Sequence, residues 1–214
     1  DRFAEGADPP AVGRRSRRVA NGVEISIQTN RMRIISGQYK GRSINPPRNL
    51  RARPTTDFAK ENLFNVLGNL LDFEECDVLD LFAGTGSISY EFASRGVRSV
   101  TSVEINSVHH SFIRQTAAQL GIRNLFAVKA NAFLYLKACT KRFDLIFSDA
   151  PYDLEESGQV IDLVLGGGLL REGGMLIFEH SKGKDFSAHP NFWQQRSYGS
   201  VQFSFFLSEK RSAE

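Results

Sequence analysis

From residue 76 onward, short hydrophobic runs alternate along the chain with stretches that have helical spacing. The hydrophobic runs that predict strands are 78–82, 100–103, 125–128, 143–148 and 175–179. The stretches that predict helices are about 87–94, 107–120, 132–139 and 158–165. Strands that are apolar throughout and separated by amphipathic helices are typical of a parallel sheet covered on both faces. The pattern therefore predicts a doubly wound, Rossmann-like α/β sheet.

The two ends of this pattern differ from its middle. Residues 192–198 and 201–207 flank a Gly-Ser turn, which predicts an antiparallel hairpin and completes a seven-stranded, mostly parallel sheet. Near the start, β-forming residues and two glycines over 33–44 predict a small β-hairpin. Thr56 or Asp57 can cap a helix after it. The apolar positions expected on one face of that helix are Phe58, Leu63, Phe64, Val66, Leu67, Leu70 and Leu71.

We divide the chain into three parts. Residues 1–31 have no helical or strand period and carry a cluster of arginines, so we expect a disordered basic tail. Our hypothesis is that this tail comes from upstream of the natural start, since Met32 opens the first patterned segment. Residues 32–56 hold the N-terminal hairpin and a loop, and residues 57–214 form the α/β domain.

Charge is distributed unevenly along the chain. Residues 1–60 hold 13 Lys and Arg against 5 Asp and Glu, whereas residues 61–214 hold 14 against 19. A basic front on a mildly acidic body favours a polyanionic partner, most commonly nucleic acid. Basic arms that are only solvated give the same count, so charge alone leaves both interpretations open.

Composition excludes several classes of protein. No apolar run approaches the roughly 18–20 residues that a membrane span needs, so we expect no membrane partner. Two cysteines, Cys76 and Cys139, exclude a disulfide framework and a four-ligand zinc site. The four histidines lack metal-ligand spacing, and we expect no metal. The default is a cytoplasmic monomer.

The loop after the first predicted strand of the sheet, residues 80–87, reads Asp-Leu-Phe-Ala-Gly-Thr-Gly-Ser. Glycines let the backbone approach a ligand and turn sharply into a helix. A dinucleotide fingerprint has a third glycine, where this chain has Ser89. The short glycine pattern is a weak signal, because many strand-to-helix turns need glycine for geometry alone. Asp80 at the start of the loop adds weight to a ligand site.

Two further strand ends carry polar candidates. Glu104 ends the second strand of the sheet, where a carboxylate can accept hydrogen bonds from both hydroxyls of a ribose. Beside the glycine loop, this role is favoured over a merely solvated carboxylate. Asn131 and Ala132 follow the third strand, where a side-chain amide can contact an adenine edge. A plain helix N-cap explains Asn131 equally well.

The fourth strand ends in Asp149-Ala150-Pro151-Tyr152, the sharpest signal in the chain. An exocyclic amine is a poor nucleophile because its lone pair is conjugated with the ring. The carboxylate of Asp149 and the carbonyl of Ala150 can hold both amino hydrogens and support the positive charge that develops on nitrogen. Pro151 stiffens the loop, and Tyr152 offers a stacking face for a base. A simple turn is the alternative interpretation.

Together these motifs resemble those of S-adenosylmethionine-dependent amino-methyltransferases. With residues 33–42 and the segment Arg-Pro-Thr-Thr-Asp at 53–57 in front, the chain resembles one family closely, over about residues 32–208. That family is the bacterial small-subunit (16S) ribosomal RNA guanine-N2 methyltransferases of the RsmD type. The tetrapeptide at 149–152 alone is shared with DNA-adenine and protein-glutamine methyltransferases, so the hairpin and the Arg-Pro-Thr-Thr-Asp segment narrow the resemblance.

The resemblance implies S-adenosyl-L-methionine as cofactor, and 16S rRNA or a partly assembled small ribosomal subunit as partner. Residues 57–214 would be the methyltransferase domain. The implied cofactor-binding residues are Asp80, Phe82, Ala83, Gly84, Gly86, Glu104, Asn131 and Ala132. The implied catalytic residues are Asp149, Ala150, Pro151 and Tyr152. The implied RNA-binding residues are Arg33, Lys40, Arg42, Arg53, Thr55 and Thr56.

One position departs from the family, which usually has proline where this chain has Ala150. The carbonyl acceptor survives, so we expect activity to be retained. Three alternatives stay open: a methyltransferase for DNA adenine N6 or a glutamine amide, a nicotinamide-dependent oxidoreductase, and a non-catalytic RNA-binding assembly module. The missing third glycine disfavours the oxidoreductase, and the Ala150 departure allows the non-catalytic module.

Overall fold

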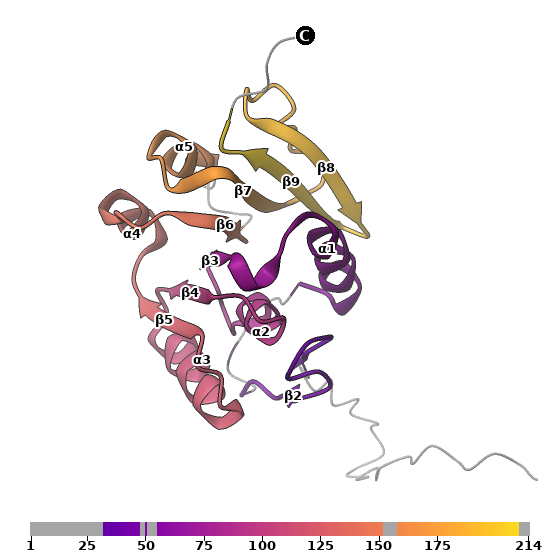
Figure 1. Ribbon diagram of the computed structural model, residues 1–214, viewed down its shortest axis with the longest axis vertical. Helices are drawn as coiled ribbons and strands as arrows, with labels where there is room; N and C mark the ends of the chain where they lie inside the picture. Colours follow the sequence, from indigo (N-terminus) through magenta and orange to yellow (C-terminus); the bar gives the residue numbers. More distant parts are fainter. Residues whose placement is uncertain (1–31, 48–49, 51–54, 152–157, 210–214) are drawn as a thin grey trace, which may run out of the picture.

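The computed structural model describes residues 32–47, 50, 55–151 and 158–209, and the predicted tail at 1–31 lies outside them. Its centre is a seven-stranded sheet in the order β5-β4-β3-β6-β7-β9-β8 (Figure 1). The strands are β3 (Asp77–Leu81), β4 (Ser99–Glu104), β5 (Leu125–Lys129), β6 (Phe143–Ser148), β7 (Leu170–Ser181), β8 (Phe192–Tyr198) and β9 (Val201–Leu207).

The strand directions agree with the sequence pattern. Strands β3 to β7 run parallel, whereas β9 pairs antiparallel with both β7 and β8. The predicted mixed sheet with a terminal hairpin is confirmed. Because β3 lies between β4 and β6, the chain reverses its direction of travel across the sheet between β3 and β6. Open α/β sheets bind ligands in the crevice at such a switch point.

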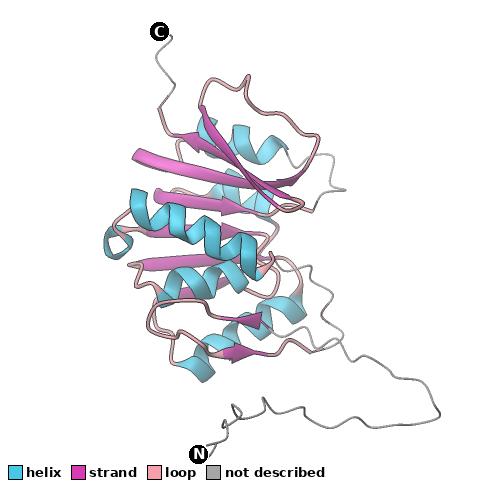
Figure 2. Cartoon of the chain, turned by 90° about the vertical axis from the view of Figure 1, so that its right-hand side faces the viewer, coloured by secondary structure: helices cyan, strands magenta, loops and turns pink. Residues whose placement is uncertain are grey.

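Helices cover both faces of the sheet. Helices α1 (Asp57–Leu70), α2 (Ser87–Ser94) and α3 (Ser107–Leu120) contribute to one hydrophobic cluster, and α4 (Ala132–Ala138) and α5 (Gln159–Gly166) contribute to the other. A short 3₁₀ turn, η1 (Phe73–Glu75), joins α1 to β3. Figure 1 shows the sheet between α4 and α5 on one side and α1 and α2 on the other, and Figure 2 looks onto the α1–α2 face.

The N-terminal hairpin packs against the domain. Strands β1 (Met32–Arg33) and β2 (Ser43–Ile44) form an antiparallel pair, as predicted, although each strand has only two residues. Ile34 is buried in the same hydrophobic cluster as α1 and α2. A Cβ on Gly37 would lie 1.9 Å from the carbonyl oxygen of Ser94 at the end of α2. Glycine is therefore required where the hairpin meets that helix.

Helix α1 corrects one expectation. Thr56 caps it, accepting a hydrogen bond from the Ala59 N–H at 3.2 Å. Two residues expected on the buried face are exposed: Leu70 in the last turn is 42% exposed, and Phe58 in the first turn is 62% exposed. Lys60 is buried in its place, only 2% exposed. Its ammonium donates to the Arg33 carbonyl at 2.9 Å and lies 3.4 Å from the buried Glu91 carboxylate. Ionic partners, and not hydropathy, decide which side of this first turn faces inward.

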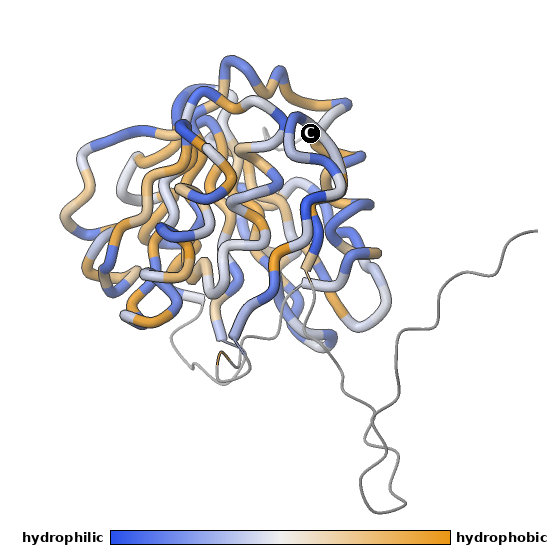
Figure 3. The backbone as a smooth tube through the Cα atoms, turned by 90° about the horizontal axis from the view of Figure 1, so that it is seen from below, coloured by the Kyte–Doolittle hydropathy of each residue, from blue (hydrophilic) through white to orange (hydrophobic). Residues whose placement is uncertain are grey.

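Hydrophobic segments of the chain are short and alternate with hydrophilic ones (Figure 3). Among the helices of the described residues, none combines the length and the apolar character that a membrane crossing requires.

Candidate functional site

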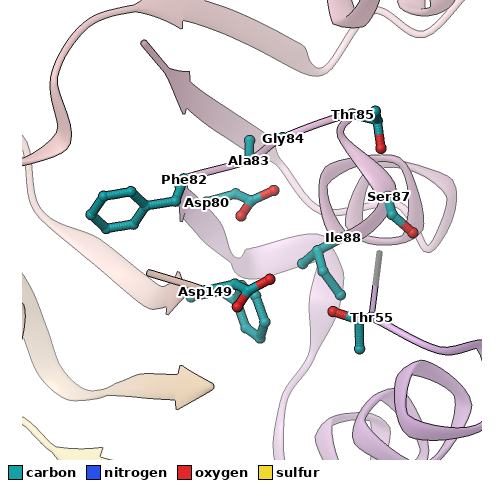
Figure 4. A pocket seen from close by; sticks show the side chains of 10 residues that line it. Thr55, Asp80, Phe82, Ala83, Gly84, Thr85, Ser87, Ile88 and Asp149 are labelled. Carbon is teal, nitrogen blue, oxygen red and sulfur yellow. The ribbon is translucent and has the colours of Figure 1, made fainter. Parts of the chain in front are cut away.

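A pocket opens at the carboxyl end of the sheet, at the switch point between β3 and β6 (Figure 4). Its lining residues are Thr55, Asp80, Phe82, Ala83, Gly84, Thr85, Ser87, Ile88, Phe147 and Asp149. The structure thus brings together four residues predicted for the cofactor, one predicted catalytic residue and one predicted RNA contact. Thr85 and Ser87, which belong to the glycine loop singled out in the sequence, also line the pocket. Ile88 and Phe147 line it as well, although the sequence analysis did not mark them.

The loop between β3 and α2 has an unusual backbone. Phe82 has a φ of 59°, and it is the one non-glycine residue in the described part of the chain with a positive φ. Gly84 and Gly86 also have positive φ, at 56° and 85°. A Cβ on Gly86 would lie 2.8 Å from the ring of Tyr90. Strain of the kind seen at Phe82 persists only where the surroundings enforce it and clusters at ligand-binding loops, so this loop is a candidate ligand-binding segment.

Glu104 fastens this loop to the end of β4. Its carboxylate accepts hydrogen bonds from the Gly84 N–H at 2.8 Å and from the Asn106 N–H at 2.7 Å. The side chain is buried, with 7% exposure. Each carboxylate oxygen has more than one acceptor site. Both oxygens therefore keep capacity for a ligand hydroxyl.

Asp80 is a buried carboxyl group at the floor of the pocket. It is 2% exposed and accepts a hydrogen bond from the Ser89 hydroxyl at 2.5 Å. Burial raises the pKa of Asp80 to about 7, the nearby Glu104 and Glu179 carboxylates add to the rise, and the Ser89 bonds oppose it. A carboxyl group in this state responds strongly to a positive ligand, because a cation favours the ionised form.

Asp149 follows β6 directly, and Figure 4 shows its carboxylate in the pocket with Thr55 across from it. Ala150 is buried in the hydrophobic cluster of α4 and α5, whereas Pro151 is exposed. Neither is among the residues that line the pocket. Tyr152 lies outside the described residues. Of the predicted catalytic tetrapeptide, the structure thus brings Asp149 to the pocket.

Glu179 is a site feature that the sequence did not reveal. It follows Phe178, the register partner of Ser148, so it lies beside the end of β6. It is 3% exposed and accepts a hydrogen bond from the Thr55 hydroxyl at 2.8 Å. This buried bond fixes one wall of the pocket to β7. Because the partners are far apart in sequence, no local pattern indicates it.

Asn131 is the N-cap of α4. Its side chain accepts hydrogen bonds from the Phe133 N–H at 2.9 Å and from the Leu134 N–H at 3.1 Å. Ala132 is buried beneath it. The ring of Phe133 packs edge-on against Phe82 of the glycine loop, with centroids 5.8 Å apart. Asn131 therefore has the structural role anticipated as the alternative, and an adenine contact stays a prediction.

The predicted RNA contacts fall in two places. Thr56 caps α1, and the Arg33 guanidinium donates to the Asp57 carboxylate at 2.9 Å, both near the pocket. Lys40 and Arg42 are exposed in the hairpin turn, which packs on the far end of α2. That helix has eight residues and is about 12 Å long, so the turn is separated from the pocket. Arg53 lies outside the described residues.

A buried ion pair links the hairpin to the pocket. The Lys60 ammonium donates to the Ser87 hydroxyl at 3.2 Å, and Ser87 lines the pocket. The Glu91 carboxylate beside it accepts from the Ile35 N–H at 2.6 Å. The sequence held one signal: Lys60 stands four residues before Phe64 and seven before Leu67, in register with the buried stripe of α1.

Comparison with known proteins decides the family. The family model described as Conserved hypothetical protein 95 matches residues 32–207. The chain belongs to this family. Ribosomal RNA small subunit methyltransferase D of Buchnera aphidicola (subsp. Baizongia pistaciae) is 28% identical over 181 residues, covering 83% of this chain and 92% of that protein. The putative rRNA methyltransferase YlbH of Bacillus subtilis is 34% identical over 155 residues, covering 71% and 83%. The resemblance to RsmD-type proteins is confirmed.

Solved structures agree with the assignment to this family. The putative methyltransferase yhhF from Escherichia coli has a TM-score of 0.73 and 27% identity, covering 85% of this chain and 99% of that one. An O-methyltransferase from Bacillus cereus in complex with SAH has a TM-score of 0.59 at 16% identity, covering 74% and 84%, which shows a shared fold. The predicted cofactor, S-adenosylmethionine, agrees with this methyltransferase fold.

Proposed function

We propose that this protein transfers a methyl group from S-adenosylmethionine to the exocyclic N2 of a guanine in small-subunit (16S) ribosomal RNA. The observation that carries the proposal is one pocket that joins the strained glycine loop to Asp149. The relatives named as ribosomal RNA small subunit methyltransferases support the substrate class.

The residues present fit the cofactor. The loop with positive φ at Phe82, Gly84 and Gly86 allows close backbone approach, and Glu104 can accept the ribose hydroxyls. Asp80 offers a carboxyl group at the pocket floor, and a positively charged ligand would favour its ionised form. When bound, S-adenosylmethionine supplies an electrophilic methyl group on a positively charged sulfonium.

Asp149 and the Ala150 carbonyl orient the amino group of the guanine. Two acceptors that hold both amino hydrogens leave the nitrogen lone pair directed at the methyl group. As the nitrogen becomes positive in the transition state, the Asp149 carboxylate stabilises that charge within a partly buried site. Tyr152 would stack on the base. The other proposed RNA contacts are Arg33, Lys40, Arg42, Arg53, Thr55 and Thr56.

The test is transfer of labelled methyl groups to small subunits from cells that lack this protein, and to naked 16S rRNA. Nucleoside analysis should find N2-methylguanosine. Asp149→Ala should lower turnover by about 10²- to 10³-fold, because one transition-state contact is lost. Asp162→Ala is the matched control, because that aspartate is exposed on α5, with 80% of its side chain accessible.

Other substrates in the same assay separate the proposed reaction from its neighbours. Incorporation into adenine of DNA or into a glutamine peptide, with none into rRNA, would reassign the substrate. RNA binding without methyl incorporation at saturating S-adenosylmethionine would contradict the proposed methyltransferase activity. It would favour a non-catalytic RNA-binding assembly module.

A further inference from the structure

A solvent-exposed aromatic ring lies beside the pocket. Phe58 lies in the first turn of α1 and is 62% exposed, although its neighbours Ala59 and Lys60 are buried. Its ring meets Tyr198 edge-on, with centroids 6.2 Å apart and planes at 83°. Tyr198 in turn packs on the fully buried Phe203, with centroids 6.0 Å apart. The exposed ring is therefore supported by a row of aromatic side chains anchored in the core.

The register of the last strands puts this pair at the same edge of the sheet as the pocket. Ser181, at the carboxyl end of β7, pairs with Val201, and Val201 pairs with Tyr198. Three strand spacings separate β6, which ends at Ser148 just before Asp149, from β8, which ends at Tyr198. These correspond to about 14 Å. Figure 1 shows the tip of β8 beside α1, as the ring contact requires.

The N-terminus of α1 links the pair directly to the pocket wall. Thr55 lines the pocket and is bonded to the buried Glu179, and Phe58 follows three residues later. The rings thus lie on the β7 side of the pocket, next to the wall that Thr55 forms.

Exposed cationic residues lie on the elements next to the rings. Arg196 is exposed two residues before Tyr198, on the same face of β8. Lys182 is exposed directly after β7, at the same edge of the sheet. Arg33, bonded to Asp57, has 62% of its side chain exposed. Cations around an exposed aromatic face are the combination that single-stranded nucleic acid binds, with bases on the rings and phosphates on the charges.

We propose that Phe58, supported by Tyr198, stacks on an unpaired RNA base that flanks the target nucleotide, with Arg196 and Lys182 contacting the adjoining phosphates. This inference rests on the proposed function, which supplies RNA as the substrate class. It assigns a second base-binding position outside the pocket, on the β7 side.

The test uses fluorescence anisotropy with a labelled, short single-stranded RNA that contains one guanine. Phe58→Ala should weaken RNA binding by about 5- to 150-fold, the range for loss of one stacked base. Phe58→Leu should show most of the same loss, since it keeps an apolar side chain without a π-face. Phe58→Trp should restore binding. S-adenosylmethionine binding should be unchanged in all three variants, which verifies the fold.

Phe126→Ala is the matched control, because that phenylalanine is 55% exposed on β5, at the other edge of the sheet. RNA affinity equal to wild type in Phe58→Ala would overturn the proposal, as would equal losses in the Phe58 and Phe126 variants. If Phe58→Ala instead changes the sedimentation mass and leaves RNA affinity intact, the ring contacts a second copy and the proposal is wrong. Wild-type RNA binding without methyl transfer would contradict the proposed function alone, because stacking is measured by binding.

Discussion

Strand β3 carries two buried aspartates, three residues apart, whose surroundings shift their pKa values in opposite directions. Asp77 at its start accepts hydrogen bonds from the Ser99 hydroxyl at 2.6 Å and from the Arg171 guanidinium at 2.8 Å. Burial alone would raise its pKa, but these donors outweigh burial and hold the pKa of Asp77 below its usual value. Asp80 receives a neutral hydroxyl, and burial raises its pKa to about 7.

The contrast extends across each edge of the sheet. At the amino edge, Arg171 also pairs with Asp144, and Arg98 pairs with Asp77 at 3.1 Å. At the carboxyl edge, Glu104 is held by backbone N–H groups, which carry no net charge. At the amino edge, guanidinium groups balance the charge of the ionised carboxylates and stabilise the fold. At the carboxyl edge, Asp80 and Glu104 bond to hydroxyl and backbone N–H groups, and a positive ligand would favour the ionised form of Asp80. One strand thus carries an ion-paired aspartate at its start and an aspartate of the candidate site at its end.

The largest change in stability is expected at the amino edge. Asp77→Ala leaves the Ser99 hydroxyl and two guanidinium groups without this acceptor, so it should lower the free energy of unfolding by about 2–3 kcal/mol. Urea unfolding at pH 8 measures the loss. Asp77→Asn, which keeps one acceptor oxygen, should lose less. The affinity for S-adenosylmethionine should stay within about twofold of wild type, and a larger fall would contradict the division between the two edges.

At the carboxyl edge, Asp80→Asn should instead raise the free energy of unfolding. The folded pKa of Asp80 is raised, so the native state holds a proton between about pH 4 and 7 that the unfolded state has lost. Wild-type stability from this group therefore falls as the pH rises through that window and is absent above about 7. Asparagine mimics the protonated group, so the variant should be about 1–2 kcal/mol more stable than wild type at pH 8.

The same variant should bind S-adenosylmethionine more weakly, because the positive ligand loses a carboxylate. Unfolding curves at pH 5 and pH 8 and calorimetric titration of the cofactor measure both effects. Equal stability of wild type and variant at pH 8, together with unchanged cofactor affinity, would show that Asp80 is not the charged floor of the pocket.

The smallest change in stability is expected for an exposed ion pair at the amino edge. The Glu75 carboxylate lies 2.9 Å from the Arg98 guanidinium, but 78% of the Glu75 side chain and 48% of the Arg98 side chain are exposed. Exposed ion pairs contribute little, so Glu75→Ala should lower the free energy of unfolding by less than about 0.5 kcal/mol. A loss comparable with that of Asp77→Ala would mean that the whole cluster acts as one unit.

Much of the fold was predictable from hydropathy. The helix expected at 107–120 matches α3, and the expected strands lie in the central sheet. Strand β7 is longer than predicted, because Gly173 and Gly174 look like a turn in sequence although pairing of Phe143 with Leu170 continues the ladder beyond them. Glycine disfavours a strand locally, and tertiary pairing overrides that preference.

Site residues that follow the ends of strands could be predicted from the sequence. Buried charged residues whose partners are distant in sequence could not. Asp80, Gly84 and Asp149 each follow a local pattern, and all three line the pocket. The burial of Lys60 and Glu179 depends on Glu91 and Thr55, which are 31 and 124 residues away in sequence. A sequence pattern predicts that a charged residue is exposed unless its partner is known. The burial of Lys60 was therefore not predicted, and Phe58 beside it was assigned to the wrong side of α1.

The contacts of the N-terminal hairpin set an order for folding. Its strands have two residues each, too short for independent stability. The Ile35 amide bonds to Glu91, and the Tyr39 hydroxyl bonds to the Gly121 carbonyl, so these partners are made 56 and 82 residues later in synthesis. The hairpin leaves the ribosome before the helices that receive it. Its contacts can therefore form only once α2 and the end of α3 are available, although the hairpin precedes both helices in the chain.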